Sequence, residues 1–198
     1  MRPELKIISD WIAPGSRVLD LGCGDGTLLA HLQSERQVTG YGLELDIDNI
    51  AACVERGVSV IQTDLDAGLT DFYEQQFDYV VMTQALQVVQ RPAQLLSEML
   101  RIGRQGIVTF PNFGHWSTRA QLFFGGRMPR TRTLPARWYD TENIHLCTLR
   151  DFEALCTEQR LKILRRSVTD HRHRAGPASK LLPNLAAQIG LYLLAKPA

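Results

Sequence analysis

The sequence predicts an α/β domain in which a mostly parallel sheet carries helices on both faces. Short apolar runs alternate with helix-compatible segments between residues 17 and 110, and this alternation is typical of βαβ units. The run F-D-Y-V-V-M at residues 77–82 is almost continuously apolar, as expected of a parallel strand covered on both faces. The 198 residues fit a single domain, residues 1–198, with a sizeable core.

The elements of the first half follow from apolar spacing and from the residues that begin and end helices. Pro92 suits the first position of a helix, and Gly57 suits the position just after one. In chain order we expect a helix at 2–12, a strand at 17–21, a helix at 27–34, a strand at 41–45, a helix from Asp46 or Asp48 to Arg56, strands at 58–62 and 77–82, a helix from Pro92 to Gly103 and a strand at 107–110.

The alternation lapses in the second half of the chain. Residues 112–147 contain many aromatic, arginine, glycine and proline residues without a clear periodicity, so we expect an irregular insertion there. Order returns with a helix that begins at Thr148, where Asp151 completes a capping box. The remaining elements are two closing strands at 162–168 and 188–195, with a basic loop at 170–183 between them.

The composition is that of an ordinary globular protein, with 44% hydrophobic and 22% charged residues. The formal net charge of +1 gives no general attraction to nucleic acid or anionic membranes. The four cysteines form no C-x-x-C motif and share no metal-ligand spacing with the five histidines, which favours reduced thiols and no metal site. No run approaches the roughly 18 apolar residues of a membrane span. We therefore expect a cytoplasmic protein with no membrane or nucleic-acid partner.

A glycine-rich loop follows the first predicted strand and opens the next helix. The stretch V-L-D-L-G-C-G-D-G has glycine at every second position, at Gly22, Gly24 and Gly26. Glycine is needed where a side chain would forbid the turn or keep a ligand away from the backbone. Glu44 stands where the second strand should finish. A glycine loop with an acid at that place predicts a nucleoside-binding βαβ unit.

The glycine spacing separates two classes of ligand. Dinucleotide-binding loops use G-x-G-x-x-G and hold a pyrophosphate at the helix N-terminus. Here the spacing is G-x-G-x-G, with Asp20 two residues before it and Asp25 within it. The two carboxylates would repel an anionic pyrophosphate but would tolerate a ligand with a sulfonium and an ammonium group. NAD binding is therefore disfavoured.

The motif D-L-G-C-G-D-G resembles motif I of the class I S-adenosylmethionine-dependent methyltransferases. The resemblance implies a Rossmann-like class I methyltransferase fold with a mostly parallel seven-stranded sheet, and S-adenosylmethionine or S-adenosylhomocysteine as the ligand. It places Asp20 near the methionyl end, Glu44 on the ribose and Asp64 on the exocyclic amine of adenine. Residues 83–86 would close the site. The implied cofactor-binding set is Asp20, Gly22, Cys23, Gly24, Glu44, Leu45, Asp64, Leu65 and Thr83.

The sequence contains no recognisable catalytic group, so the catalytic residues stay unknown. The fourth predicted strand ends in M-T-Q-A rather than in the N-P-P-Y or D-P-P-Y of amine-directed methylases, and no acidic cluster for a metal is evident. An enzyme is still compatible with this pattern, because methyl transfer to a good nucleophile can run on proximity alone.

Three further features have two interpretations each. His115 and His145 are either acid/base groups near the cofactor or hydrogen-bonding residues within loops. The segment D-H-R-H-R at 170–174 is either an anion or metal site or a solvated loop. We interpret Cys23 as a packing residue rather than a nucleophile, because the neighbouring carboxylates oppose a thiolate.

Three phrases after the fourth predicted strand resemble the MetW family of bacterial methionine-biosynthesis proteins. They are S-E-M-L-R-I-G-R at 97–104, F-P-N-F-G-H-W at 110–116 and W-Y-D-T-E-N-I-H-L-C-T-L-R-D-F at 138–152. The resemblance implies that the chain accompanies a homoserine O-acyltransferase in acyl-homoserine formation, as an accessory or regulatory subunit. The alternative is an S-adenosylmethionine-dependent methyltransferase that acts on a small molecule.

Residues 112–145 are a candidate partner surface. The stretch is rich in aromatic residue types that are enriched at interfaces, and it has no acidic residue between His115 and Tyr139. Either the aromatic residues anchor a partner, or they pack beneath a long loop while the arginines stay solvated. The residues concerned are Phe113, Trp116, Phe123, Phe124, Trp138 and Tyr139, with Arg119, Arg127, Arg130, Arg132 and Arg137.

Overall fold

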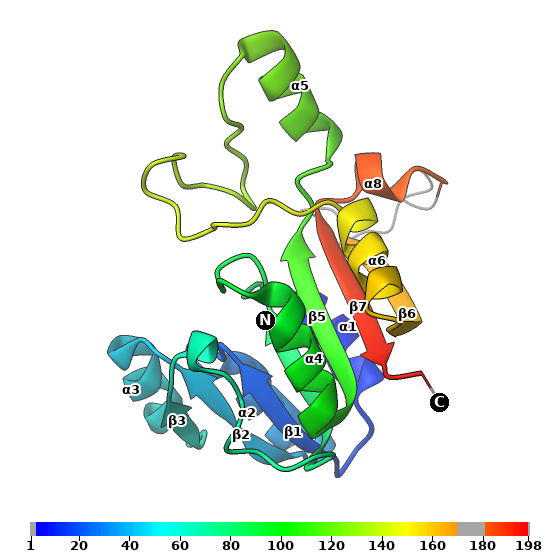
Figure 1. The fold of residues 1–198 in the computed structure, drawn as a ribbon. Helices are drawn as coiled ribbons and strands as arrows, with labels where there is room; N and C mark the ends of the chain where they lie inside the picture. The colour runs from blue at the N-terminus through cyan, green and yellow to red at the C-terminus, as the bar shows by residue number, and fades with distance from the viewer. Residues whose placement is uncertain (1–2, 170–180, 198) are drawn as a thin grey trace.

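The computed structural model describes residues 3–169 and 181–197. Within them seven strands form one sheet: β1 (Arg17–Leu21), β2 (Thr39–Glu44), β3 (Val60–Gln62), β4 (Phe77–Thr83), β5 (Gly103–Pro111), β6 (Lys162–Thr169) and β7 (Ile189–Ala195). Their order across the sheet is β3-β2-β1-β4-β5-β7-β6 (Figure 1). Strands β1 to β5 run parallel, and β7 lies antiparallel between β5 and β6.

Helices cover both faces of this sheet. The described helices are α1 (Pro3–Trp11), α2 (Thr27–Arg36), α3 (Ile47–Glu55), α4 (Pro92–Ile102), α5 (Trp116–Gly125), α6 (Leu149–Glu158) and the short α8 (Pro183–Ala186), with a 3-10 turn, η1 (Leu65–Ala67), after β3. Buried side chains of α1, α2 and α3 join one apolar core, and those of α4 and α6 join a second. Helix α5 joins neither core and projects from the sheet (Figure 1).

Successive residues of the central strands feed the two cores, because neighbouring side chains of a strand point to opposite faces. On β1, Val18 joins the core of α1 and α2, whereas Leu19 joins the core of α4. Leu191 and Tyr192 of β7 divide in the same way. Both neighbours must be apolar, which explains the near-continuous apolar runs and confirms the prediction of a sheet covered on both faces.

The helix signals act at the predicted positions. Asp46, one of two candidates, begins α3: its Oδ1 accepts hydrogen bonds from the backbone N–H groups of Asp48 at 2.8 Å and Asn49 at 3.0 Å. Gly57 follows that helix with a φ of +73°. Pro92 begins α4, and the predicted capping box begins α6.

The insertion at 112–147 is not wholly irregular, which corrects the prediction. Helix α5 occupies ten of its residues. Thr118 alone among those ten is buried, so the apolar side chains of α5 form no stripe that faces a core and leave no periodic signal. The basic segment at 170–174 lies outside the described residues.

Candidate cofactor site

The predicted cofactor residues lie at one edge of the sheet. The register pairs Asp20 of β1 with Gly42 of β2 on one side and with Val81 of β4 on the other. Because the three strands are parallel, the glycine loop, Glu44 at the end of β2 and Thr83 at the end of β4 meet at the carboxyl edge. Open α/β sheets bind their ligands at this edge.

The glycine loop turns where residues with a side chain are strained. Gly22, Gly24 and Gly26 have φ values of +67°, +54° and +74°, a region that other residues rarely adopt. A Cβ on Gly26 would also lie 2.9 Å from the sulfur of Cys53. A Cβ on Gly24 would meet no described atom within 4 Å. The loop therefore presents open space at Gly24, where a ligand can approach the backbone.

Two cysteines pack beneath this loop. The sulfurs of Cys23 and Cys53 are 3.7 Å apart, and the Cys53 thiol donates to the backbone oxygen of Gly24 at 3.1 Å. Burial, and then the nearby Asp20 carboxylate, raises the pKa of Cys23. The Cys23 thiol therefore stays protonated at neutral pH and packs under the loop, in agreement with its interpretation as a packing residue.

Gly42 of β2 makes room for that packing. A Cβ at this position would lie 2.3 Å from the sulfur of Cys23 and 2.6 Å from its Cβ. Sequence analysis did not single out Gly42 or Cys53. The available signal for Gly42 was its place as the second glycine of G-Y-G-L-E, residues 40–44. The contact between Cys53 and Cys23, thirty residues apart, left no local pattern.

Glu44 joins the end of β2 to the glycine loop. Its Oε2 accepts the backbone N–H of Gly24 at 2.7 Å, and its Oε1 accepts those of Leu45 at 2.9 Å and Asp46 at 3.0 Å. A carboxylate offers about four acceptor positions, and these three bonds leave one on Oε2. That position fits the hydroxyl donor of a ribose. The Leu45 side chain is exposed beside it.

The loop after β3 brings the predicted adenine residues to the same edge. Asp64 begins η1, where its Oδ1 accepts the backbone N–H of Asp66 at 2.9 Å. Leu65 is half-buried, and its Cδ1 would lie 3.9 Å from a Cβ on Gly22. The Leu65 side chain therefore lies beside the glycine loop. A hollow of about 290 Å³ lies on the side of η1 that faces α4.

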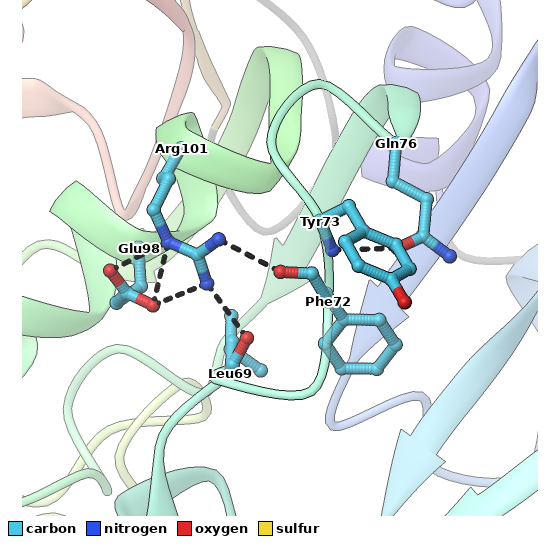
Figure 2. A network of polar contacts seen from close by, with 6 residues as sticks. All are labelled: Leu69, Phe72, Tyr73, Gln76, Glu98 and Arg101. Atoms are coloured by element: carbon cyan, nitrogen blue, oxygen red, sulfur yellow. Dashed lines mark hydrogen bonds and ion pairs between the residues drawn. The ribbon is translucent and has the colours of Figure 1, made fainter.

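Arg101 of α4 holds the chain between η1 and β4 (Figure 2). Its guanidinium donates to the backbone oxygens of Leu69 and Phe72, both at 2.8 Å. Glu98, one turn earlier, accepts from the same guanidinium at 2.7 Å, and this hydrogen bond lowers the pKa of Glu98. Both residues belong to the phrase S-E-M-L-R-I-G-R, whose structural role is to fix this loop beside η1.

The end of β4 carries a residue, Gln84, whose strained backbone no sequence pattern indicated. Gln84 has a φ of +56°, and its backbone N–H donates to the backbone oxygen of Thr109 at 2.9 Å. Its side-chain Nε2 lies 3.5 Å from Oε1 of Glu4, a buried residue of α1. Thr83, just before this turn, is half-buried. Such turns cluster at functional sites, and this one directs the chain from β4 past the glycine loop.

The two histidines hydrogen-bond within loops. His115 begins α5, where its ring Nδ1 accepts the backbone N–H of Ser117 at 3.3 Å. The Nε2 of His145 lies 3.4 Å from the backbone oxygen of Gln90.

Within the described residues no group of three or more His, Cys, Asp or Glu side chains is placed to hold a metal ion. None of the described helices is long and apolar enough to cross a membrane.

The insertion exposes large aromatic side chains. Phe123 and Phe124 on α5 are 81% and 84% exposed, and Trp138 is 73% exposed. A hollow of about 540 Å³ beyond α5 is lined by arginine and aromatic side chains together with Gly126 and Met128. The arginine and aromatic members are Arg127, Arg130, Arg137, Trp138 and Tyr139. The rings of Phe123 and Phe124 therefore do not pack beneath a long loop, which was one of the two interpretations of the aromatic residues in this segment.

A family model described as methionine biosynthesis protein MetW matches residues 2–194. The bifunctional methionine biosynthesis protein MetXA/MetW of Rhodopirellula baltica is 38% identical over 157 residues, which are 75% of this chain and 25% of that protein. The chain therefore spans about a quarter of the length of this curated relative.

Solved methyltransferase structures share the fold. A SAM-dependent methyltransferase from Archaeoglobus fulgidus has a TM-score of 0.70 at 14% identity, over 98% of this chain and 92% of that one. Phosphoethanolamine N-methyltransferase 2 of Haemonchus contortus, in complex with S-adenosyl-L-methionine, has a TM-score of 0.71 at 16% identity, over 99% of this chain and 52% of that one. At these low identities the likeness shows the fold alone. The TM-scores confirm the predicted class I methyltransferase fold.

Proposed function

The chain belongs to the MetW family of methionine biosynthesis proteins, and on that premise we propose that it binds S-adenosylmethionine or S-adenosylhomocysteine and accompanies a homoserine O-acyltransferase in acyl-homoserine formation. In this role it is an accessory or regulatory subunit. One observation carries the cofactor assignment: the glycine loop leaves open space at Gly24, and the backbone N–H of Gly24 donates to Glu44, the residue that we assign to the ribose.

The residues at the sheet edge fit this cofactor in charge and shape. S-adenosylmethionine, when bound, supplies a methyl group that its sulfonium activates. Asp20 is a buried carboxylate at the end of β1, and a buried negative charge favours the sulfonium and ammonium groups. The remaining acceptor position of Glu44 takes a ribose hydroxyl, and Asp64 takes the exocyclic amine of adenine. Leu65 covers the ring beside the loop.

The partner assignment has two supports. The relative from Rhodopirellula baltica carries the names MetXA and MetW in one protein, and fusion places two modules at a high effective concentration. The exposed aromatic side chains of α5 supply the second support, because such patches mark protein contacts. We assign docking to the surface at 112–145. Catalysis of methyl transfer plays no part in this role.

Mixing the purified chain with a purified homoserine O-acyltransferase tests the proposal. We expect the two proteins to co-elute in size-exclusion chromatography, and we expect the chain to change the initial rate of acyl-homoserine formation. Absence of both effects would contradict the partner assignment. Calorimetry tests the cofactor assignment separately: S-adenosylhomocysteine should bind saturably, whereas NAD should not. Tighter binding of NAD would overturn it.

A methyltransferase that acts on a small molecule is the second candidate. The observation that favours it is the complete cradle of Asp20, Gly24, Glu44 and Asp64 at the carboxyl edge, open at Gly24. Transfer of a labelled methyl group to candidate metabolites would support this function. Tight cofactor binding without turnover on any of them would favour the accessory role.

The single domain with its partner surface, the cytoplasmic location and the lack of a nucleic-acid partner stay predictions.

A further inference from the structure

A third hollow, of about 390 Å³, lies where α5, α6, α8 and β6 meet. Figure 1 shows α6 and α8 at the same end of β7. None of the proposed cofactor residues lines this hollow. Its lining is Arg119, Arg150, Glu153, Arg166, Leu181, Leu182, Pro183, Asn184 and Leu185, and we call it the arginine pocket.

The phrase F-P-N-F-G-H-W builds the wall of this pocket. The side-chain Nδ2 of Asn112, which is 3% exposed, donates to the backbone oxygens of Asn184 at 3.0 Å and Ala187 at 2.8 Å. Its Oδ1 accepts the backbone N–H of Gly114 at 2.9 Å. The Oδ1 of Asn184 accepts the backbone N–H of Leu149, the first residue of α6, at 3.1 Å. One buried amide therefore joins the end of β5 to α8, which in turn is joined to α6.

Gly114 is required for this junction. A Cβ there would lie 2.9 Å from the Oδ1 of Asn184 and 3.0 Å from that of Asn112. The backbone oxygen of Gly114 in turn accepts the Nε of Arg119 at 2.7 Å. The guanidinium is thus held through Nε, and its two Nη groups make no hydrogen bond within the described part of the chain. The junction positions Arg119 as a donor toward the pocket.

The other charged groups leave the pocket positive. Arg166 lies 3.2 Å from Oε1 of Glu153, which also accepts the hydroxyl of the buried Tyr192 at 2.8 Å. The side chain of Arg150 makes no ion pair or hydrogen bond in the part of the chain that the structure describes. Among the described lining residues, three guanidinium groups from three elements therefore accompany one carboxylate, and that carboxylate is already paired with Arg166.

An apolar rim adjoins these charges. Leu181 and Leu182 are 81% and 61% exposed beside the pocket. Guanidinium groups match the geometry of carboxylate and phosphate oxygens and bind them through charge-assisted hydrogen bonds. We propose that the arginine pocket binds an organic anion, with its carboxylate or phosphate head on Arg119 and Arg150 and its apolar part on the leucine rim. This site goes beyond the proposed function and is separate from the cofactor cradle.

Calorimetry of the full chain with four probes tests the site: hexyl phosphate, hexanoate, inorganic phosphate and hexanol. At least one of the two amphiphilic anions should bind saturably and more tightly than inorganic phosphate, and hexanol should not bind. The head group that binds more tightly identifies the source of the anion. Arg150→Gln should weaken that binding by at least about tenfold, because it removes charge-assisted hydrogen bonds. Arg104→Gln, at an exposed arginine of β5 outside the pocket, should leave it unchanged.

Four results would overturn the site: no saturable binding of either amphiphilic anion, equal binding of inorganic phosphate, equal binding of hexanol, or the same affinity in Arg150→Gln as in the wild type. An unchanged thermal midpoint shows that the variant is folded. Arg150 has no partner within the described residues, so we expect that midpoint to stay the same. Cofactor and acyltransferase binding are measured separately, and their failure would leave this site standing.

Discussion

The glycine loop after β1 and the insertion after β5 differ in the burial of their apolar side chains. Beneath the loop, Cys23 and Cys53 of α3 are buried and contact each other. In the insertion, the rings of Phe123 and Phe124 are exposed and belong to neither core. Both residues lie on α5, which projects from the sheet (Figure 1). The loop region is packed within the chain and leaves space for a small ligand. The insertion leaves apolar surface that a protein partner would cover.

The charges of the two regions differ as well. The glycine loop and the strand ends beside it carry the acidic residues Asp20, Asp25 and Glu44, whereas the insertion has arginines and no acid from His115 to Tyr139. A cationic cofactor suits the first region, and a partner face with negative charge suits the second. Under the proposed function, the cofactor and the partner would therefore bind to separate regions of the chain, and variants in one region should spare the other.

Removing the exposed rings should have the largest effect. We expect the double variant Phe123→Ser, Phe124→Ser to weaken binding of the acyltransferase by about a hundredfold or more, since anchor residues carry about 2 kcal/mol or more each. The affinity for S-adenosylhomocysteine should not change. Tyr73→Ser is the matched control, because Tyr73 is 82% exposed but lies outside the insertion. Equal binding by the double variant and the wild type in a pull-down titration would contradict the docking assignment.

A side chain at Gly42 should disturb the packing under the glycine loop and leave the insertion unchanged. Gly42→Ala puts a Cβ against Cys23, and overpacking of this kind lowers the free energy of unfolding by about 2 kcal/mol. Because Cys23 lies under the loop, cofactor affinity should fall too. Gly125→Ala is the control: its Cβ meets no described atom within 4 Å, and we expect a change below about 0.5 kcal/mol. Equal urea midpoints for the two variants would refute the packing role of Gly42.

Neutralising Glu44 should weaken binding of the cofactor without weakening binding of the acyltransferase. Glu44→Gln removes a charged acceptor that holds the loop and that we assign to the ribose, so we expect about a tenfold loss of S-adenosylhomocysteine affinity by calorimetry. Glu55→Gln, on the exposed surface of α3, serves as the control. If both variants bind the cofactor like the wild type, Glu44 has no part in the site.

Two thiols, Cys147 at the end of the insertion and Cys156 of α6, should make stability fall at alkaline pH. Burial raises the pKa of Cys147 from 9.0 to about 12 and that of Cys156 to about 11. Below pH 9 both states keep these protons; above it the unfolded chain releases them first, so stability is lost as pH rises toward 12. The slope is at most about 1.4 kcal/mol per pH unit for each thiol. Cys147→Ala should show a shallower decline in denaturant titrations, and an unchanged slope would contradict it.

The turns of the glycine loop could be predicted from the sequence because their signals are local. Glycine at every second position and an acid at the end of the next strand are read within thirty residues, and the turns at Gly22, Gly24 and Gly26 demand that residue type. The apolar alternation likewise predicted the strands, since both faces of the sheet are covered.

The features that sequence analysis missed depend on long-range contacts. Asn112 bonds to the chain 72 and 75 residues later, and no local pattern encodes that. Gln84 adopts its positive φ while its backbone N–H bonds to Thr109 of the neighbouring strand. Helix α5 lacked a core-facing stripe because it packs against neither core. An exposed helix of this kind is difficult to predict from a pattern that reports burial.

Hydrogen–deuterium exchange of the chain alone, with S-adenosylhomocysteine and with the acyltransferase, tests the separation of the two regions most directly. Binding slows exchange where it suppresses local opening. The cofactor should protect residues 22–27, 44–46 and 63–67 and leave residues 116–139 unchanged. The acyltransferase should protect 116–139 and leave the glycine loop unchanged. Protection of the glycine loop by the acyltransferase, with 116–139 exchanging at the free rate, would contradict the assignment of the two regions.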